Sequence, residues 1–150
     1  MALGFAFRQR LRGTYHRLSD PGVELPVSLD VAIELPLGQL LRDGRGRLGG
    51  HFDAEGYATR ARLEGTFGLD LGKRKLVYDF HFPADDGRER RFHGETAFEL
   101  RQPVRTMEDL VGRLYDEDRE DARVLLRVPM TTGIRTLLRT ARAGFTTRMG

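Results

Sequence analysis

The sequence predicts an all-β protein: an antiparallel up-and-down barrel of about eight strands, with a short helix after the second strand and an amphipathic helix at the carboxyl end. Two observations predict it. Between Arg45 and Val128, apolar and polar residues alternate in runs that are separated by short turn-forming segments. The lengths of these segments keep the apolar residues of successive runs on one face, which matters because side chains along a strand alternate between its two faces.

The bulk composition bounds the classes of function. A chain of 150 residues fits a single domain, 1–150, and is long enough to bury a core. It contains no cysteine, which excludes disulfides, thiol catalysis and cysteine-bound metals. There is no long apolar segment and no export signal at the amino end, so we expect a cytoplasmic protein. The net charge of +3 is too small to indicate nucleic-acid binding.

The first two strands are expected over residues 4–16 and 23–35, joined by a turn at 19–22. Pro26 lies inside the second strand and predicts an edge position or a bulge, because proline has no N–H to donate to a neighbouring strand. Residues 36–43 then predict a short helix that begins with a proline.

The glycine-rich segment Gly44–Gly50 superficially resembles a phosphate-binding loop. It lacks the lysine–hydroxyl pair and the strand–loop–helix setting of such loops. We therefore interpret it as a bend that enters a third strand. That strand and the next, 57–69, are joined by a turn at Glu55-Gly56.

The fifth and sixth strands are expected at about 73–83 and 88–100. The loop 85–87 between them ends in glycine, which is a common three-residue hairpin connection. This loop predicts that Phe80 faces Phe92 inside the barrel.

The last two strands are expected near 110–116 and 122–130, on either side of an acidic loop. Pairing Asp116 with Ala122 keeps their apolar faces in phase. A helical period follows over about 132–147, after a threonine suited to begin a helix.

Three histidines are candidate metal ligands: His51, His81 and His93. The predicted register places all three on the outer face of the barrel, and His81 lies opposite Arg91. We therefore expect solvated surface histidines and no metal site.

The predicted inner face mixes bulky aromatic residues with glycines. Small barrels either fill such an interior with large and small side chains or keep a cavity for one ligand, and both outcomes stay open here. A cavity would suit a sterol, a fatty acyl chain or a similar apolar molecule. The candidate ligand-binding residues are Tyr15, Phe52, Tyr57, Phe67, Tyr78, Phe80, Phe92 and Thr96.

The carboxyl-terminal helix gives a second candidate surface, because its arginines lie largely off its apolar stripe. Arg135, Arg139 and Arg142 could contact an anionic membrane surface or an acidic partner. The alternative is a helix that closes one end of the barrel and leaves its arginines in solvent.

Several short runs together resemble a poorly characterised bacterial domain that occurs beside GMC-type flavin oxidoreductases of the cholesterol-oxidase kind. The resemblance spans roughly residues 11–142. Its runs are Arg12–Tyr15, Leu40–Asp43, Gly65–Leu69, Leu76–Phe80, Asp86-Gly87, Phe92–Gly94, Arg105–Leu110 and Leu114–Asp116. The resemblance implies a role near lipid or sterol oxidation and a flavin oxidoreductase or another lipid-metabolising enzyme as partner. It supplies no catalytic residue, and the chain lacks a flavin-binding motif.

The expected function is a non-enzymatic barrel of calycin-like (lipocalin-like) outline that binds an apolar ligand, without a cofactor. The alternative is a structural or protein-interaction module with a filled core and an arginine-bearing helix. A third hypothesis is a small lipid-modifying enzyme. It is weaker because the sequence contains no nucleophile motif and no pair of catalytic carboxylates.

Overall fold

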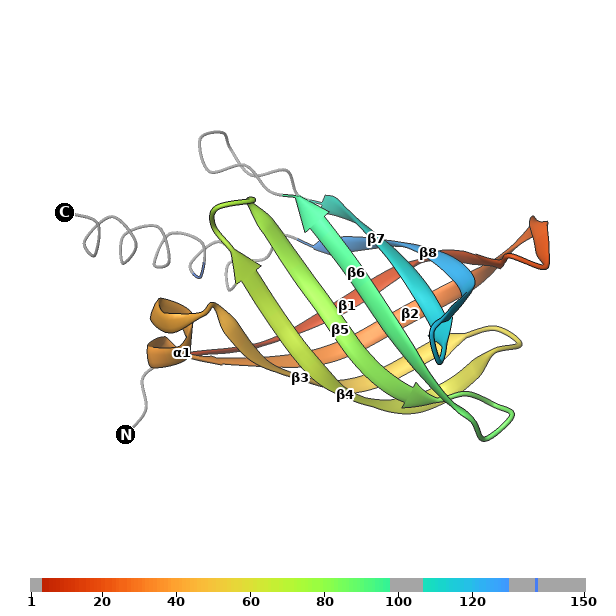
Figure 1. The fold of residues 1–150 in the computed structure, drawn as a ribbon, viewed down its shortest axis with the longest axis horizontal. Coiled ribbons are helices and arrows are strands. Elements are labelled where there is room, and N and C mark those ends of the chain that lie inside the picture. Colours follow the sequence, from red (N-terminus) through yellow and green to blue (C-terminus); the bar gives the residue numbers. More distant parts are fainter. Residues whose placement is uncertain (1–3, 98–106, 130–136, 138–150) are drawn as a thin grey trace.

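The chain forms a closed antiparallel barrel of eight strands (Figure 1). Each strand pairs with the next in the sequence, and the eighth pairs back to the first. The computed structural model of the chain describes residues 4–97, 107–129 and 137. The predicted all-β, antiparallel, up-and-down barrel is confirmed.

The elements follow the predicted order, including one short helix after the second strand. They are β1 (Gly4–Arg17), β2 (Asp20–Pro36), α1 (Leu37–Arg42), β3 (Arg45–Ala54), β4 (Ala58–Asp70), β5 (Lys75–Pro83), β6 (Glu89–Ala97), β7 (Met107–Asp116) and β8 (Arg119–Pro129). Pro36 is the residue that caps α1, and Leu37 is the first helical residue. Because β3 begins at Arg45, directly after Gly44 with φ +68°, the glycine-rich segment is a bend entering a strand, as expected.

The barrel has two distinct ends (Figure 1). The turns between β1 and β2, β3 and β4, β5 and β6, and β7 and β8 lie at one end, which we call the hairpin end. Helix α1 and the β4–β5 turn lie at the other, which we call the α1 end. This arrangement follows from simple up-and-down connectivity.

The predicted register of β5 and β6 is confirmed. Phe80 faces Phe92, as expected, and His81 faces Arg91 on the outer side. Gly87 has φ +83°, the left-handed conformation that the three-residue loop requires.

The first hairpin turns earlier than predicted. Arg17 pairs directly with Asp20, so the turn falls at Leu18 and Ser19 and β2 begins before the expected proline–glycine turn. The ladder between β2 and β3 begins at Val27, one residue after Pro26. Pro26 thus lies where β2 leaves its second neighbour, consistent with the predicted edge position.

The predicted register of β7 and β8 is wrong by two residues. Ala122 pairs with Leu114 and not with Asp116, which pairs with Arg119. The acidic run is therefore not a long loop: it turns tightly through Glu117, which has φ +57°, and continues as strand. The shift of two residues keeps the same side chains inside, because the side-chain period is two.

The core fills the barrel interior. Phe92 shows how bulky and small residues combine. Its ring lies over Gly94 of its own strand, β6, and over Gly112 of the neighbouring strand, β7. A Cβ atom added at Gly94 or Gly112 would lie 2.8 or 2.5 Å from that ring. These inner-face glycines make room for an aromatic ring and not for a ligand.

Most of the predicted carboxyl-terminal helix, 132–147, lies outside the described residues. Its one described residue, Leu137, is fully buried and belongs to the core. No helix among the described residues is long and apolar enough to cross a bilayer.

Candidate functional site

The eight residues predicted to line a ligand cavity come together inside the barrel. None is more than 5 % exposed, and their rings pack against one another. The rings of Phe80 and Phe92 stack at 4.7 Å between centroids, and those of Phe52 and Phe82 lie 4.6 Å apart. A residue that lined a water-sized void would present accessible surface to it, so this part of the interior is filled by side chains. As ligand contacts, the eight residues stay a prediction.

Two of the predicted polar groups have partners inside the barrel. The Tyr78 hydroxyl donates a hydrogen bond to Gln9 Oε1 at 2.6 Å, and complete burial raises the pKa of Tyr78 well above its ordinary value. Thr96 Oγ1 donates to the backbone oxygen of Asp109 at 2.6 Å.

Gln9 is a buried residue that the sequence-based prediction missed. It is 3 % exposed, and its Nε2 has no hydrogen-bond partner. The signal was present in the sequence: Gln9 is a polar residue at an inward position of β1, between the apolar Phe7 and Leu11.

A charged network closes the hairpin end, and it was also missed. Arg90 and Asp116 point inward and are each 8 % exposed. Arg90 donates to Asp86 at 2.8 Å, and its guanidinium lies 5.8 Å from the centre of the Tyr57 ring. The Tyr57 hydroxyl donates to Asp121 at 2.8 Å, and burial together with this bond raises the pKa of Tyr57. At the same end, the Tyr15 hydroxyl donates to the backbone oxygen of Glu55.

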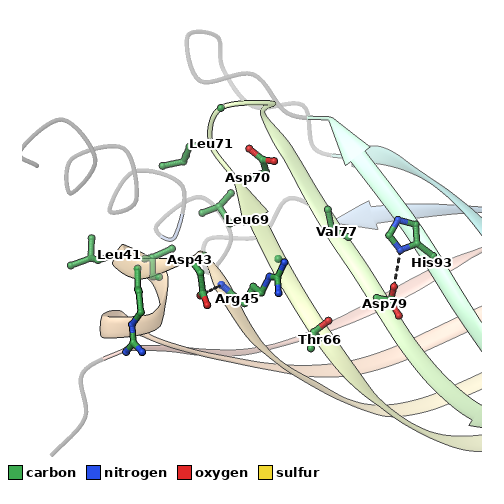
Figure 2. A pocket seen from close by; sticks show the side chains of 15 residues that line it. Leu41, Asp43, Arg45, Thr66, Leu69, Asp70, Leu71, Val77, Asp79 and His93 are labelled. Atoms are coloured by element: carbon green, nitrogen blue, oxygen red, sulfur yellow. Dashed lines mark hydrogen bonds and ion pairs between the residues drawn. The ribbon is translucent and has the colours of Figure 1, made fainter. Parts of the chain in front are cut away.

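A groove of about 840 Å³ lies at the α1 end, on the outer face of β3 to β6 (Figure 2). Helix α1 and the β4–β5 turn flank it. Its size falls within the roughly 300–1,000 Å³ that small-molecule sites occupy. The described residues that line it are Leu40, Leu41, Arg42, Asp43, Gly44, Arg45, Thr66, Gly68, Leu69, Asp70, Leu71, Gly72, Val77, Asp79 and His93.

The groove is apolar near α1 and polar farther along the strands. Leu41 of α1 and Leu71 of the β4–β5 turn line it, and Val77 of β5 lies on its floor (Figure 2). Beside Val77 the floor is Gly68, where an added Cβ would have only ordinary contact, 3.6 Å from the Val77 Cβ. A larger side chain at Gly68 would therefore project into the groove without backbone strain.

The polar end is built by the cross-strand row of Thr66, Asp79 and His93. Asp79 accepts hydrogen bonds from Arg91 Nε at 3.0 Å and shares one with His93 Nδ1 at 2.8 Å. Partial burial opposes ionisation of Asp79, but these bonds outweigh it and hold the pKa below its ordinary value. His93 Nε2 lies 3.5 Å from Glu95 Oε1, so both ring nitrogens face carboxylates. Thr66 offers a hydroxyl to the polar end of a ligand, whereas Asp79 and His93 are engaged with each other and with Arg91 and Glu95.

The three predicted surface histidines do point outward. The prediction missed that His93 is half-buried and paired with Asp79. The described residues contain no group of three metal-binding side chains. Arg135, Arg139 and Arg142 lie outside the described residues.

Comparison with known proteins adds no relative. No protein-family model, no curated protein and no solved structure shows a significant match to this chain.

Proposed function

We propose that this protein is a non-enzymatic binding protein, and that it holds an apolar ligand in the groove beside α1. One observation carries the proposal: the aromatic interior is packed, whereas the groove is open and has leucine and valine side chains beside a polar row. An apolar body could lie against Leu41, Leu71 and Val77. Its polar group would then reach the Thr66 hydroxyl.

The ligand class that we propose is a fatty acyl chain or a sterol. The lining supports this class, because it combines a leucine-rich wall with hydrogen-bonding groups at one end. The sequence resemblance to a domain beside cholesterol-oxidase-like enzymes supports it independently, and it is the sole basis for proposing such an enzyme as partner.

A fluorescent fatty acid tests the proposal, with binding followed by its emission. Gly68→Leu should project from the groove floor into the ligand's position and weaken binding by about tenfold or more, equivalent to roughly 1.4 kcal/mol. Gly49→Leu is the matched control. Gly49 also points outward from the barrel, and an added Cβ there would have only ordinary contact, 4.0 Å from the Leu63 backbone oxygen, but it does not line the groove.

The outcomes separate the hypotheses. Loss of binding in Gly68→Leu with binding retained in Gly49→Leu supports the groove. Equal binding by both variants would move the site elsewhere, for example to the interior residues. Absence of binding by the unaltered protein would reject a ligand-binding function, leaving the interaction module, which a packed core equally supports. Competition by unlabelled fatty acid and by sterol then identifies the preferred class.

A further inference from the structure

The outer face formed by β7, β8 and β1 carries a dense group of arginines on the side of the barrel opposite β4 and β5. All of them are exposed and point outward from the barrel wall. We call this the arginine face, and its arginines are Arg8, Arg10, Arg12, Arg113, Arg123 and Arg127. The described carboxylates that point outward from the same three strands are Asp109 and Glu120.

Strand pairing sets several of these arginines directly against one another. Arg12 lies opposite Arg127, and Arg113 lies opposite Arg123. Like charges in directly opposed positions of an antiparallel pair are destabilising. The repulsion between these opposed arginines therefore lowers the stability of the fold. An anion bound to the face from outside would reduce that repulsion.

The carboxylates on and beside this face neutralise only part of the charge. Asp30 Oδ2 on the adjacent strand β2 lies 3.6 Å from the Arg10 guanidinium. Glu120 Oε1 lies 2.9 Å from Arg123 Nε and 3.7 Å from Arg113 Nε, so one carboxylate pairs with two guanidinium groups. Asp109 lies 4.0 Å from Arg127, at the limit of an ion pair. Among the described residues, Arg12 has no acidic partner.

Two aliphatic side chains lie exposed at the centre of the arginine face. Val111 is 63 % exposed, Leu125 is 48 % exposed, and the two pair directly across β7 and β8. Two residues away along the strands lie the pair Arg113 and Arg123 in one direction and the pair Asp109 and Arg127 in the other. Cations thus flank an apolar centre on both sides.

The rest of the barrel wall has a different charge. On β2 to β6, outward carboxylates outnumber outward basic residues. The carboxylates are Asp20, Glu24, Asp30, Glu34, Asp53, Glu64, Asp70, Asp79, Glu89 and Glu95, and the basic residues are Arg45, Arg47, Arg60, Arg62, Lys75 and Arg91. The barrel is therefore electrically polarised across its width, and an anionic surface would orient it with the arginine face inward.

We propose that the arginine face binds the surface of a bilayer that contains anionic phospholipid. Guanidinium groups pair with phosphate oxygens, and exposed aliphatic residues enter the boundary between headgroups and acyl chains. A nucleic-acid backbone would leave Val111 and Leu125 without an apolar partner. A bilayer needs neither a shaped pocket nor a fixed register, which fits long side chains around a small apolar centre. This proposal does not depend on the ligand groove.

Sedimentation with lipid vesicles tests it, using phosphatidylcholine alone and phosphatidylcholine mixed with phosphatidylglycerol. The protein should sediment with the mixed vesicles only, and added salt should release it. Arg12→Glu with Arg127→Glu should reduce the partition coefficient by about tenfold or more, given how strongly each basic residue near an anionic bilayer contributes.

Arg47→Glu with Arg62→Glu is the matched control. It makes the same change in net charge on the opposite wall, at residues that neither line the groove nor form an ion pair among the described residues. It should retain most of the binding. Leu125→Ser, which leaves the charge unchanged, should weaken binding by a smaller factor, and circular dichroism verifies the fold of each variant.

Four results would overturn the proposal. They are no binding to the mixed vesicles, an equal loss in both charge-reversal pairs, a loss caused only by Arg135→Glu with Arg139→Glu and Arg142→Glu, and tighter binding to duplex DNA or to an acidic polypeptide than to the vesicles. The third result would assign the contact to the carboxyl-terminal segment, and the fourth to a different class of partner.

Discussion

The barrel interior and the groove beside α1 are built from alternate residues of the same strands, yet they differ in what they can do. Inward residues of β5 and β6, such as Tyr78, Phe80 and Phe92, have no exposed surface, and their rings pack against other rings of the core. Outward residues of the same strands, such as Val77 and His93, border open space. In this barrel, therefore, the inward side chains stabilise the fold, and the outward side chains are available for binding.

The largest expected effect is in the interior. Phe92→Ala removes a ring that covers two glycines and stacks on Phe80, and the glycines cannot fill the space. We expect a loss of about 3–5 kcal/mol in the free energy of unfolding. Urea denaturation measures it.

The comparison within that experiment is Val77→Ala on the groove floor, for which we expect a loss below about 1 kcal/mol. Similar losses for the two variants would show that the groove is part of the core.

An intermediate effect is expected at the buried polar pair. Gln9→Leu leaves the Tyr78 hydroxyl without its acceptor and should cost about 1–3 kcal/mol. Combining it with Tyr78→Phe removes both partners and should recover much of that loss. Thermal or urea unfolding of the two single variants and the double variant gives the coupling, and additive losses would show that the bond contributes nothing.

A small and pH-dependent effect is expected beside the groove. Asp79 has a lowered pKa in the folded protein, so its interactions stabilise the fold above its ordinary value of 3.8 and lose that effect as the pH falls through the lowered pKa. Asp79→Asn should therefore cost about 1 kcal/mol or less at neutral pH. Urea midpoints of the two proteins should converge in acid, and a difference that persists there would assign the effect to packing instead of charge.

Part of the fold could be predicted because local signals agree. The β5–β6 register follows from a loop of fixed length that ends in Gly87, and the two strands have unbroken alternation. The prediction of the β7–β8 register is wrong because it treats the acidic run, 116–121, as a loop. In the fold its residues extend both strands, and Asp116 points inward to Arg90. Inward charges interrupt the alternation that the prediction follows.

The groove could not be predicted for a different reason. Its lining comes from α1, the β4–β5 turn and the outer faces of β3 to β6, which meet only once the barrel curls and α1 folds against it. Sequence patterning identifies which residues point outward, but it does not show where a helix leaves a hollow over them. The pairing of Asp79 with His93 was predictable from register, and its position at the end of a groove was not.

Methyl-resolved NMR during titration with a long-chain fatty acid tests whether the ligand binds in the groove beside α1 and not in the barrel interior. We expect the methyl resonances of Leu41, Leu71 and Val77 to shift, while those of the interior residues Leu29 and Leu63 stay in place. Shifts confined to the interior methyls would contradict this expectation, because they would mean that the packed aromatic core opens to hold the ligand.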